Sequence, residues 1–349
     1  MQSITLDSKN AYLTLTNTAT AGSAILHTAR ALDARSSWRP VALGACALPT
    51  SDLVETRRAA HLKQVGAKTL LMQPAWGSPE EHTLCELDAD KLSFAPKDKD
   101  FKICYTSYCE TMSLDDVQVV GTRWYANAGG APNLQMSSDQ GATWRAIIGN
   151  MESMACTNQA FHLIGNRLLV GGECPLDMAY IRAYQMNADN SALASKTELP
   201  ITLPKLENRN VQFISSVAGS ERVFAGVEGG LLRSDDSGRS FKFVIEQAVS
   251  GGSNYMYITS LLAPAGKPNT LVVSGWDKAK GLPYLAWSSD NGDKWIDLSS
   301  LLPGYKPGAR EATSQVTSMV EDAQGRILVT VNEEFQAKGR LVAVKLGTL

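Results

Sequence analysis

The chain has 349 residues, enough for one large domain or two ordinary ones. Hydrophobic residues make up 44% of it, so a sizeable core can form, which argues against general disorder. Lys and Arg number 33 against 35 Asp and Glu, and this balance gives no electrostatic reason to expect nucleic acid or an anionic membrane as a partner. No stretch approaches the roughly 18 uninterrupted apolar residues of a membrane-spanning helix.

Seven β-rich segments recur along the chain at intervals of 44 to 58 residues. They are AYLTLT from residue 11, TLLMQP from 69, RWYANAGG from 123, RLLVGG from 167, RVFAGV from 222, TLVVSG from 270 and RILVTV from 326. A strand with alternating side chains usually precedes each segment, and two further strands follow, as in YLAWSSD and KWIDL. Four antiparallel strands repeated about every 50 residues predict an all-β fold, a β-propeller with seven blades, six being the alternative.

One turn pattern, Ser-x-Asp-x-Gly-x-x-aromatic, occurs three times, at spacings of 97 and 54 residues. Its positions are Ser137, Asp139, Gly141 and Trp144, then Ser234, Asp236, Gly238 and Phe241, and finally Ser288, Asp290, Gly292 and Trp295. The Asp side chain can accept turn N–H groups, the Gly supplies a positive φ, and the aromatic ring packs as the next strand starts. The pattern predicts a tight hairpin, and Asp33, Asp90 and Asp189 lie in weaker copies.

These turns resemble the Asp-box, or BNR, repeat of sialidase-like propellers, although Phe241 stands where Trp is usual. That superfamily includes sialidases, other glycoside hydrolases, photosystem II assembly factors and sorting-receptor domains. The resemblance implies the propeller fold, with the Asp boxes as structural turns away from the ligand-binding face. It names no function by itself.

The repeat extends over most of the chain and predicts a single propeller domain, residues 1–349. The last blade is expected to stop after its third strand, RLVAVKLGTL. The segment QSITL could supply the missing outer strand of that blade or the inner strand of the first blade, and either arrangement has exposed sheet edges to protect.

Six cysteines, an even number with no CxxC motif, fit disulfides in an oxidising compartment better than a metal site. A hairpin folded about Gly165 and Asn166 brings Cys156 opposite Cys174, which predicts a disulfide between them. Cys104 and Cys109 could close a small ring in one loop, while Cys46 and Cys85 have no geometric argument, so the pairing of these four stays open. The start MQSITLDSKN lacks the features of a signal peptide, so an exported chain would be a mature form.

The loops at the end of the blades opposite the Asp turns are expected to carry the function. Aromatic and charged side chains gather there, and the candidates for ligand binding are Arg58, Trp76, Arg209, Tyr255, Trp276, Asp277, Tyr305, Arg310 and Glu311. Aromatic rings of this kind stack on sugars or anchor a protein partner, but they also pack loops.

Enzymatic interpretations depend on the carboxylates of the same loops. Candidate catalytic residues are Glu110, Glu152, Glu173 and Asp177. A glycoside hydrolase needs two carboxylates roughly 5 to 9 Å apart, and a sialidase needs three arginines, for which Arg58, Arg209 and Arg310 are candidates, with a tyrosine nucleophile. The sialidase Phe/Tyr-Arg-Ile-Pro motif is not matched, since the nearest string is Trp38-Arg39-Pro40-Val41.

No motif for a serine nucleophile, a phosphate-binding loop or a zinc protease is present in the sequence. We expect no cofactor and no metal site, although carboxylates around the channel of a propeller could hold a divalent cation. The sequence therefore predicts a periplasmic or extracellular module that binds a protein or a glycan without catalysis. A glycoside hydrolase is the alternative, and the oligomeric state is left open.

Overall fold

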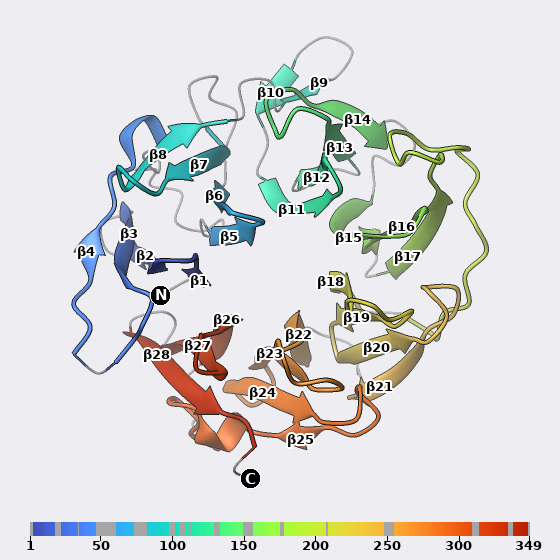
Figure 1. The fold of residues 1–349 in the computed structure, drawn as a ribbon. Coiled ribbons are helices and arrows are strands. Elements are labelled where there is room, and N and C mark those ends of the chain that lie inside the picture. The colour runs from blue at the N-terminus through green and yellow to red at the C-terminus, as the bar shows by residue number, and fades with distance from the viewer. Residues whose placement is uncertain are drawn as a thin grey trace.

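Each sheet of the protein is built from strands that follow one another in the chain, so one sheet is completed before the next begins. The computed structural model describes residues 3–17, 22–33, 35–46, 61–72, 82–97, 102–104, 109–111, 114–128, 133–148, 156–174, 178–206, 209–247, 255–308, 314–333 and 338–347. Seven antiparallel sheets stand around one axis and form a seven-bladed β-propeller (Figure 1). The predicted fold is confirmed, and the six-bladed alternative is wrong.

The first three blades come from the N-terminal part of the chain. Their strands are β1 (Ser3–Leu6), β2 (Asn10–Asn17), β3 (Gly22–Ala29) and β4 (Arg39–Pro40), then β5 (His61–Val65), β6 (Lys68–Met72), β7 (Leu84–Asp88) and β8 (Ser93–Pro96), then β11 (Leu114–Val120), β12 (Arg123–Ala128), β13 (Asn133–Ser137) and β14 (Arg145–Ile148). The 3-10 helix η1 (Gly44–Cys46) lies between blades 1 and 2, and the hairpin of β9 (Lys102–Cys104) and β10 (Cys109–Thr111) lies between blades 2 and 3.

The other four blades complete the ring. Their strands are β15 (Thr157–Ile164), β16 (Arg167–Cys174) and β17 (Met178–Gln185), then β18 (Val211–Ser216), β19 (Val223–Val227), β20 (Gly230–Ser234) and β21 (Lys242–Glu246), then β22 (Met256–Leu262), β23 (Leu271–Asp277), β24 (Leu282–Ser288) and β25 (Ile296–Asp297), then β26 (Gln315–Glu321), β27 (Arg326–Glu333) and β28 (Lys338–Lys345). The 3-10 helix η2 (Ser299–Leu301) follows β25.

Two blades depart from the four-stranded pattern in the described part of the chain. In blade 4 the fourth position is reduced to one antiparallel bridge between Ala183 and Leu199. Blade 7 consists of β26, β27 and β28, so it stops after its third strand as the sequence predicts. The segment at the N-terminus forms β1 and pairs with β2, which settles its place as the inner strand of blade 1.

Seven clusters of buried apolar side chains occupy the boundaries between neighbouring blades, as far as the described residues show. Between blades 5 and 6 the cluster includes Phe224, Leu231, Ile258 and Val273. Each second strand of a blade lies between two such clusters, so both of its faces are buried. Because both faces are buried, the second strands are apolar along their length, and they are the seven β-rich segments that recur in the sequence.

The ring closes by packing between blades 7 and 1 rather than by a shared strand. Ile4 and Leu13 of blade 1 contact Leu328 of blade 7 in one buried cluster, and the half-buried Trp38 packs against it. The backbone of Ile4 also bonds to the Ser318 hydroxyl at 3.4 Å through both its N–H and its carbonyl. Figure 1 shows the N-terminal strand β1 beside β26 at this junction.

The three Ser-x-Asp-x-Gly turns join third to fourth strands with one common hydrogen-bond network. The Ser137 hydroxyl bonds to Asp139 Oδ1 at 2.7 Å and accepts the Gly141 N–H at 2.8 Å, and the other two turns repeat both distances. The Asp carboxylate also accepts the N–H four residues later at 2.8 to 2.9 Å. The glycines have φ of 79 to 89°, a region that suits a residue without Cβ.

The weaker copies of the turn keep part of this network. Asp33 Oδ1 accepts the Arg35 N–H at 2.7 Å, and Asp189 Oδ1 accepts the Ser191 N–H at 3.1 Å. In blade 2 the bonding carboxylate is Asp88 rather than Asp90, because Asp88 Oδ1 accepts the N–H groups of residues 90 and 91. The sequence periodicity therefore located this turn but chose the wrong aspartate in it.

Candidate functional site

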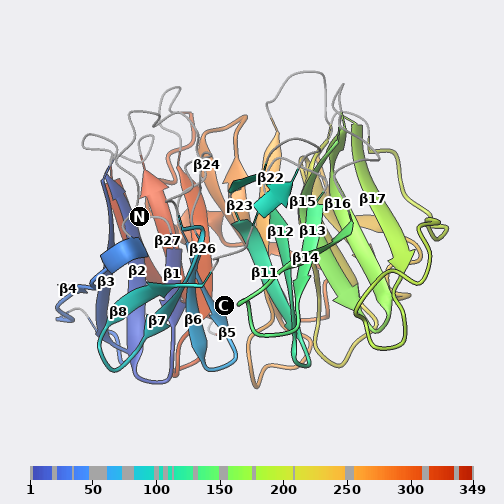
Figure 2. The same ribbon diagram turned by 90° about the horizontal axis from the view of Figure 1, so that it is seen from above.

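The two ends of the propeller differ in how the strands are joined. We call the end that carries the three Ser-x-Asp-x-Gly turns the turn face, and the opposite end the loop face. Strands in a blade alternate in direction, so the connections from second to third strands and from one blade to the next lie on the loop face. Figure 2 shows the blades from the side, with the strands running between these two ends.

A pocket of about 380 Å³ lies at the loop-face end of blade 6, which we call the blade 6 pocket. Its polar lining comes from the ends of β21, β23, β24 and β25, from η2 and from the segment after η2. These residues are Gln247, Asp277, Lys280, Tyr284, Asp297, Ser299 and Tyr305. Apolar walls are supplied by Met256, Leu282 and Pro283. Its volume lies within the range of about 300 to 1,000 Å³ that small-ligand pockets have.

Asp277, the last residue of β23, shapes one side of the blade 6 pocket through the turn that follows it. Its Oδ1 accepts the Lys280 N–H at 3.1 Å, and its Oδ2 lies 2.7 Å from Lys280 Nζ. Gly281 closes the turn with a φ of 66° before β24 begins. The side chain of Asp277 is only 10% exposed, while that of Lys280 is 64% exposed, so the carboxylate is fixed and the ammonium lies at the rim.

The other side of the blade 6 pocket is formed by the end of β25 and by β21 of the neighbouring blade. Asp297 Oδ1 accepts the Ser299 N–H at 2.8 Å, which orients the carboxylate at the start of η2. Gln247 Oε1 accepts the Met256 N–H at 2.6 Å and so ties the end of blade 5 to the start of blade 6. The pocket is thus built on strand ends, which hold its side chains more rigidly than a free loop would.

The electrostatic character of the blade 6 pocket is acidic. Burial raises the pKa of the Tyr284 hydroxyl well above its ordinary value, and the charges of Asp297 and Asp277 raise it further. A hydrogen bond to Asp277 raises the pKa of Lys280 despite partial burial. Both shifts have the sign expected where two carboxylates face one ammonium.

Beside the pocket, Tyr255, Tyr257 and Trp276 form a row of aromatic rings, which we call the aromatic row. The Tyr255 and Tyr257 ring centroids lie 5.8 Å apart, and the Tyr257 and Trp276 rings stack at 5.2 Å. Trp276 and Asp277 are neighbours on β23 and therefore point to opposite sides of the sheet, so the row and the pocket flank the same strand. Lys278 Nζ lies 6.0 Å from the Tyr257 ring, at the limit of a cation–π contact.

Acidic side chains from blades 4 and 5 reach the aromatic row. Burial raises the pKa of Tyr257 strongly, and so do its hydrogen bond to Glu228 and the nearby charge of Glu173. Glu173 Oε2 also accepts a hydrogen bond from Asn210 Nδ2 at 2.9 Å. Tyr257 is therefore a stably protonated phenol that can donate a hydrogen bond.

Arg209, a predicted ligand-binding residue, is engaged within blade 5 and only 6% exposed. Its guanidinium donates to the Glu228 carbonyl at 2.9 Å and lies 3.3 Å from Glu246 Oε1. The same group lies 4.6 Å from the Phe243 ring centroid. These contacts use the planar head of the side chain to fasten the loop-face end of the blade, so it is not presented to a ligand.

The residues predicted for ligand binding and for catalysis fall into three groups. The structure brings together Tyr255, Trp276, Asp277 and Tyr305 at the loop-face end of blade 6. Arg209 and Glu173 lie on the two preceding blades, next to this group. Arg58, Trp76, Glu152, Asp177, Arg310 and Glu311 lie outside the described residues, and of Glu110 only the backbone, in β10, is described.

Two contributors were not expected from the sequence: Tyr257 and Asp297. Tyr257 follows Tyr255 by two residues on one strand, a spacing that places both side chains on one side of the sheet. This period-two pairing was the available signal for Tyr257. Asp297 reaches the site through the fold at the end of β25, for which the sequence offers no signal.

The central channel contains a second hollow of about 740 Å³, lined by the inner strands. Lys63 and Asp116 form an ion pair there, and His162 Nε2 lies 2.8 Å from the Ser216 hydroxyl. Burial lowers the pKa of His162 to about 4, so the ring is neutral near pH 7. Within the described ranges, no three His, Cys, Asp or Glu side chains gather as metal ligands, and the divalent cation stays a prediction.

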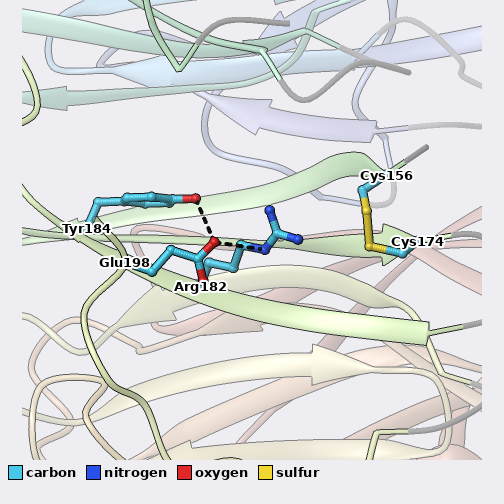
Figure 3. Close-up of a disulfide and its surroundings, with 5 residues drawn as sticks. All are labelled: Cys156, Cys174, Arg182, Tyr184 and Glu198. Carbon is cyan, nitrogen blue, oxygen red and sulfur yellow. Dashed lines mark hydrogen bonds and ion pairs between the residues drawn. A yellow bond between two sulfur atoms is a disulfide. The ribbon is translucent and has the colours of Figure 1, made fainter. Parts of the chain in front are cut away.

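Two disulfides are described, and one is the predicted bond between Cys156 and Cys174, which joins the loop-face ends of β15 and β16 (Figure 3). Figure 3 also shows Glu198 between Tyr184 and Arg182 of β17, with Oε1 3.4 Å from each partner atom. The second disulfide joins Cys46 of η1 to Cys85 of β7, a pairing for which the sequence offered no geometric argument. Cys104 and Cys109 face each other in the register of β9 and β10. Disulfides fit an extracellular or periplasmic location.

Comparison with known proteins identifies the fold. No protein-family model and no curated protein matches the chain. YCF48 from Cyanidioschyzon merolae is similar with a TM-score of 0.54 at 11% identity, over 94% of this chain and 91% of that one. A structure titled YCF48 bound to D1 peptide gives 0.55 at 12% identity, over 99% and 92%. The extracellular domain of BT4673 from B. thetaiotaomicron gives 0.52 at 15% identity, over 83% of this chain and 32% of that chain.

These likenesses show a propeller fold, with no shared activity implied at such identities. In the described part of the chain, none of the helices is long and apolar enough to cross a membrane.

Proposed function

We propose that this protein is an exported, non-catalytic binding or assembly module whose loop face holds a protein partner at blade 6. The observation that carries the proposal is the aromatic row of Tyr255, Tyr257 and Trp276 beside an acidic pocket on the same strand. Aromatic anchors next to a concave, charged site are typical of the centres of protein interfaces. The fixed positions of these rings lower the entropy lost on binding.

Several finer features belong to the same proposal. The three Ser-x-Asp-x-Gly turns are Asp-box repeats with a structural role, and residues 1–349 form one propeller domain. The location is extracellular or periplasmic, which the two disulfides support. No cofactor takes part. One of the similar propellers, YCF48, has a structure titled as bound to D1 peptide. By analogy of fold alone, this supports a protein or peptide as the partner.

A glycoside hydrolase is the alternative, and two observations weigh against it. The raised pKa of Tyr257 is opposite to what a tyrosine nucleophile needs, and Arg209 is occupied within blade 5.

The proposal is tested by recovering the partner and measuring its affinity. The tagged protein is used to capture ligands from the periplasmic or secreted fraction of the organism that makes it, and each purified candidate is titrated by calorimetry. Trp276→Ala is expected to weaken binding about tenfold or more, as for an interface hot spot. Val120→Ala, which removes an exposed apolar side chain from β11 at the turn face, is the matched control and should bind as the wild type does.

Equal binding by Trp276→Ala and the wild type would contradict the proposed site. A glycan array and a reducing-sugar assay run on the same preparations provide the other arms. Glycan binding without a protein partner, or release of reducing sugar, would contradict the proposed function itself.

A further inference from the structure

We propose that the blade 6 pocket binds a guanidinium group, the head of an arginine side chain on the partner. The guanidinium site itself is argued from the pocket, and only the assignment of the arginine to the protein partner rests on the proposed function. Its basis is the juxtaposition of Asp277, Asp297 and Tyr284 around one hollow of about 380 Å³.

The shape of the blade 6 pocket suits a single long side chain. Met256, Leu282 and Pro283 give apolar walls, against which the methylene stem of an arginine can pack. The polar lining residues Asp277, Asp297 and Tyr305 stand at the ends of strands and in the segment after η2. The lining therefore offers both apolar side chains for the stem of such a guest and oxygen acceptors for its head.

The charges of the blade 6 pocket favour a cation. Among its lining residues, Asp277 and Asp297 carry two negative charges and Lys280 carries one positive charge, which leaves a formal charge of −1. The Lys280 side chain is 64% exposed, so its ammonium can move into solvent when a second cation approaches Asp277. The upward pKa shifts of Tyr284 and Lys280 have the sign that a net negative potential produces.

The acceptors of the blade 6 pocket belong to three separate side chains, which favours guanidinium over ammonium. Asp297 accepts one N–H, from Ser299, and the described residues give its carboxylate no other hydrogen bond. The Tyr284 hydroxyl likewise has no hydrogen-bond partner in the described part of the chain, although it lines the hollow. A guanidinium has five N–H donors in a planar fork and can satisfy several separate oxygens at once, whereas an ammonium is a point charge.

The experiment uses Nα-acetyl-arginine amide as the probe and the full chain as the receptor. The backbone N–H groups of Lys280 and Ser299 donate to the two carboxylates, so their amide NMR signals report directly on the pocket. We expect both signals to shift in a saturable way, and the affinity to fall when salt is added. Nα-acetyl-citrulline amide, which has the same shape without the charge, should leave both signals in place, and Nα-acetyl-lysine amide should bind more weakly.

Two variants change the affinity in opposite directions. Asp297→Asn removes the exposed carboxylate and is expected to weaken arginine amide binding about two- to fivefold. Lys280→Gln removes the competing ammonium and is expected to strengthen it by a similar factor. The matched control is Asp90→Asn, which removes the same charge from an 89% exposed side chain on blade 2 and should change nothing.

The outcomes separate this inference from the proposed function. Shifts that citrulline amide reproduces, or an affinity unchanged in both pocket variants, would overturn the guanidinium site. If the guanidinium site fails in this way while Trp276→Ala still weakens partner binding, the proposed function stands without the arginine pocket. If arginine amide binds as expected and Trp276→Ala leaves the affinity for the partner unchanged, the guanidinium site is supported and the proposed interface is wrong.

Discussion

Glu228 of blade 5 and Tyr257 of blade 6 form an isolated antiparallel bridge across the boundary between their blades. The adjoining Gly229 donates its N–H to the Met256 carbonyl at 2.6 Å, and the Tyr257 hydroxyl bonds to the Glu228 carboxylate. Main chain and side chain of the same pair therefore join the two sheets at their loop-face ends. Because Tyr257 also stacks on Trp276, this link fixes the aromatic row relative to blade 5.

Replacing the carboxylate in this pair should lower the pKa of the Tyr257 hydroxyl. Burial is the largest cause of the upward shift and remains in Glu228→Gln, so the pKa should fall without reaching its ordinary value. NMR titration of ring-labelled tyrosine, with Tyr257→Phe to assign the signal, measures the change. Glu246→Gln, an exposed carboxylate of the same blade, is the control, and an unchanged Tyr257 pKa in Glu228→Gln would show that the hydrogen bond does not form.

The raised tyrosine pKa values also predict loss of stability at high pH. Burial comes first among the causes that raise the pKa of Tyr257, Tyr180 and Tyr284, so the folded protein keeps these protons where the unfolded chain, with values near 10, releases them. The contribution of these tyrosines to the free energy of unfolding should thus be constant below about pH 10 and fall as the pH rises above it. Urea denaturation across this range checks the sign, and a smaller decline is expected for Tyr257→Phe.

At the acid end, the turn aspartates should contribute stability that is lost below about pH 4. Hydrogen bonds from Thr143 lower the pKa of Asp139 to about 2. Burial alone would raise the pKa of Asp236, but hydrogen bonds from Ser240 and Ser234 outweigh it and lower this pKa to about 2 as well. Between the ordinary value of 3.8 and 2, the unfolded chain binds more protons than the folded one. The free energy of unfolding should therefore fall as the pH drops through this window.

Urea denaturation of the wild type and Asp236→Asn from about pH 6 to about pH 2 measures this contribution. The variant should be less stable at the upper end and show a flatter decline below about pH 4. Asp90→Asn serves as the control because its side chain is 89% exposed. Parallel decline in all three proteins would mean that the turns do not carry the acid sensitivity.

Removing either disulfide should destabilise the protein, and the loss should be larger for the disulfide that encloses the longer loop. The bond between Cys46 and Cys85 spans 39 residues and the bond between Cys156 and Cys174 spans 18. Loop-closure entropy predicts losses of about 4 and about 3 kcal/mol, respectively, when each pair is replaced by serine. Urea denaturation without reductant gives the difference, and with strong reductant the variants should match the wild type.

The fold was predictable because its signals are local and repeated. The Asp139, Asp236 and Asp290 turns carry their whole hydrogen-bond network within eight residues, and the second strands carry their apolar run for a reason common to every blade. The Cys156–Cys174 bond followed from the register of one hairpin. Each of these features depends only on residues close together in the chain.

The site was only partly predictable because it depends on contacts between blades. Tyr305 and Asp277 were identified as loop-face residues, but their shared pocket also needs Gln247 from the preceding sheet. Arg209 was expected to face a ligand, and its capture by Glu246 and the Glu228 carbonyl depends on the packing at the end of blade 5. The Cys46–Cys85 bond joins the segment between blades 1 and 2 to β7 of blade 2, and the repeat pattern of the sequence does not predict it.

Gly275 should be among the least replaceable residues of blade 6, because no space exists for a side chain there. A Cβ built on Gly275 would lie 1.8 Å from the Tyr257 carbonyl oxygen, and backbone atoms cannot move aside without shifting β22. Gly275→Ala should thus destabilise the protein and displace the aromatic row, because Tyr257 would be pushed out of its stack on Trp276.

Gly66→Ala provides the comparison: a Cβ there meets nothing within 4 Å, so only its φ of +59° opposes the change, at about 1 kcal/mol. Urea denaturation should therefore show a larger loss for Gly275→Ala, accompanied by a change in tryptophan fluorescence that Gly66→Ala does not produce. Equal losses in the two variants would mean that the β22–β23 contact relaxes freely, and that the close approach of these strands does not hold the aromatic row in place.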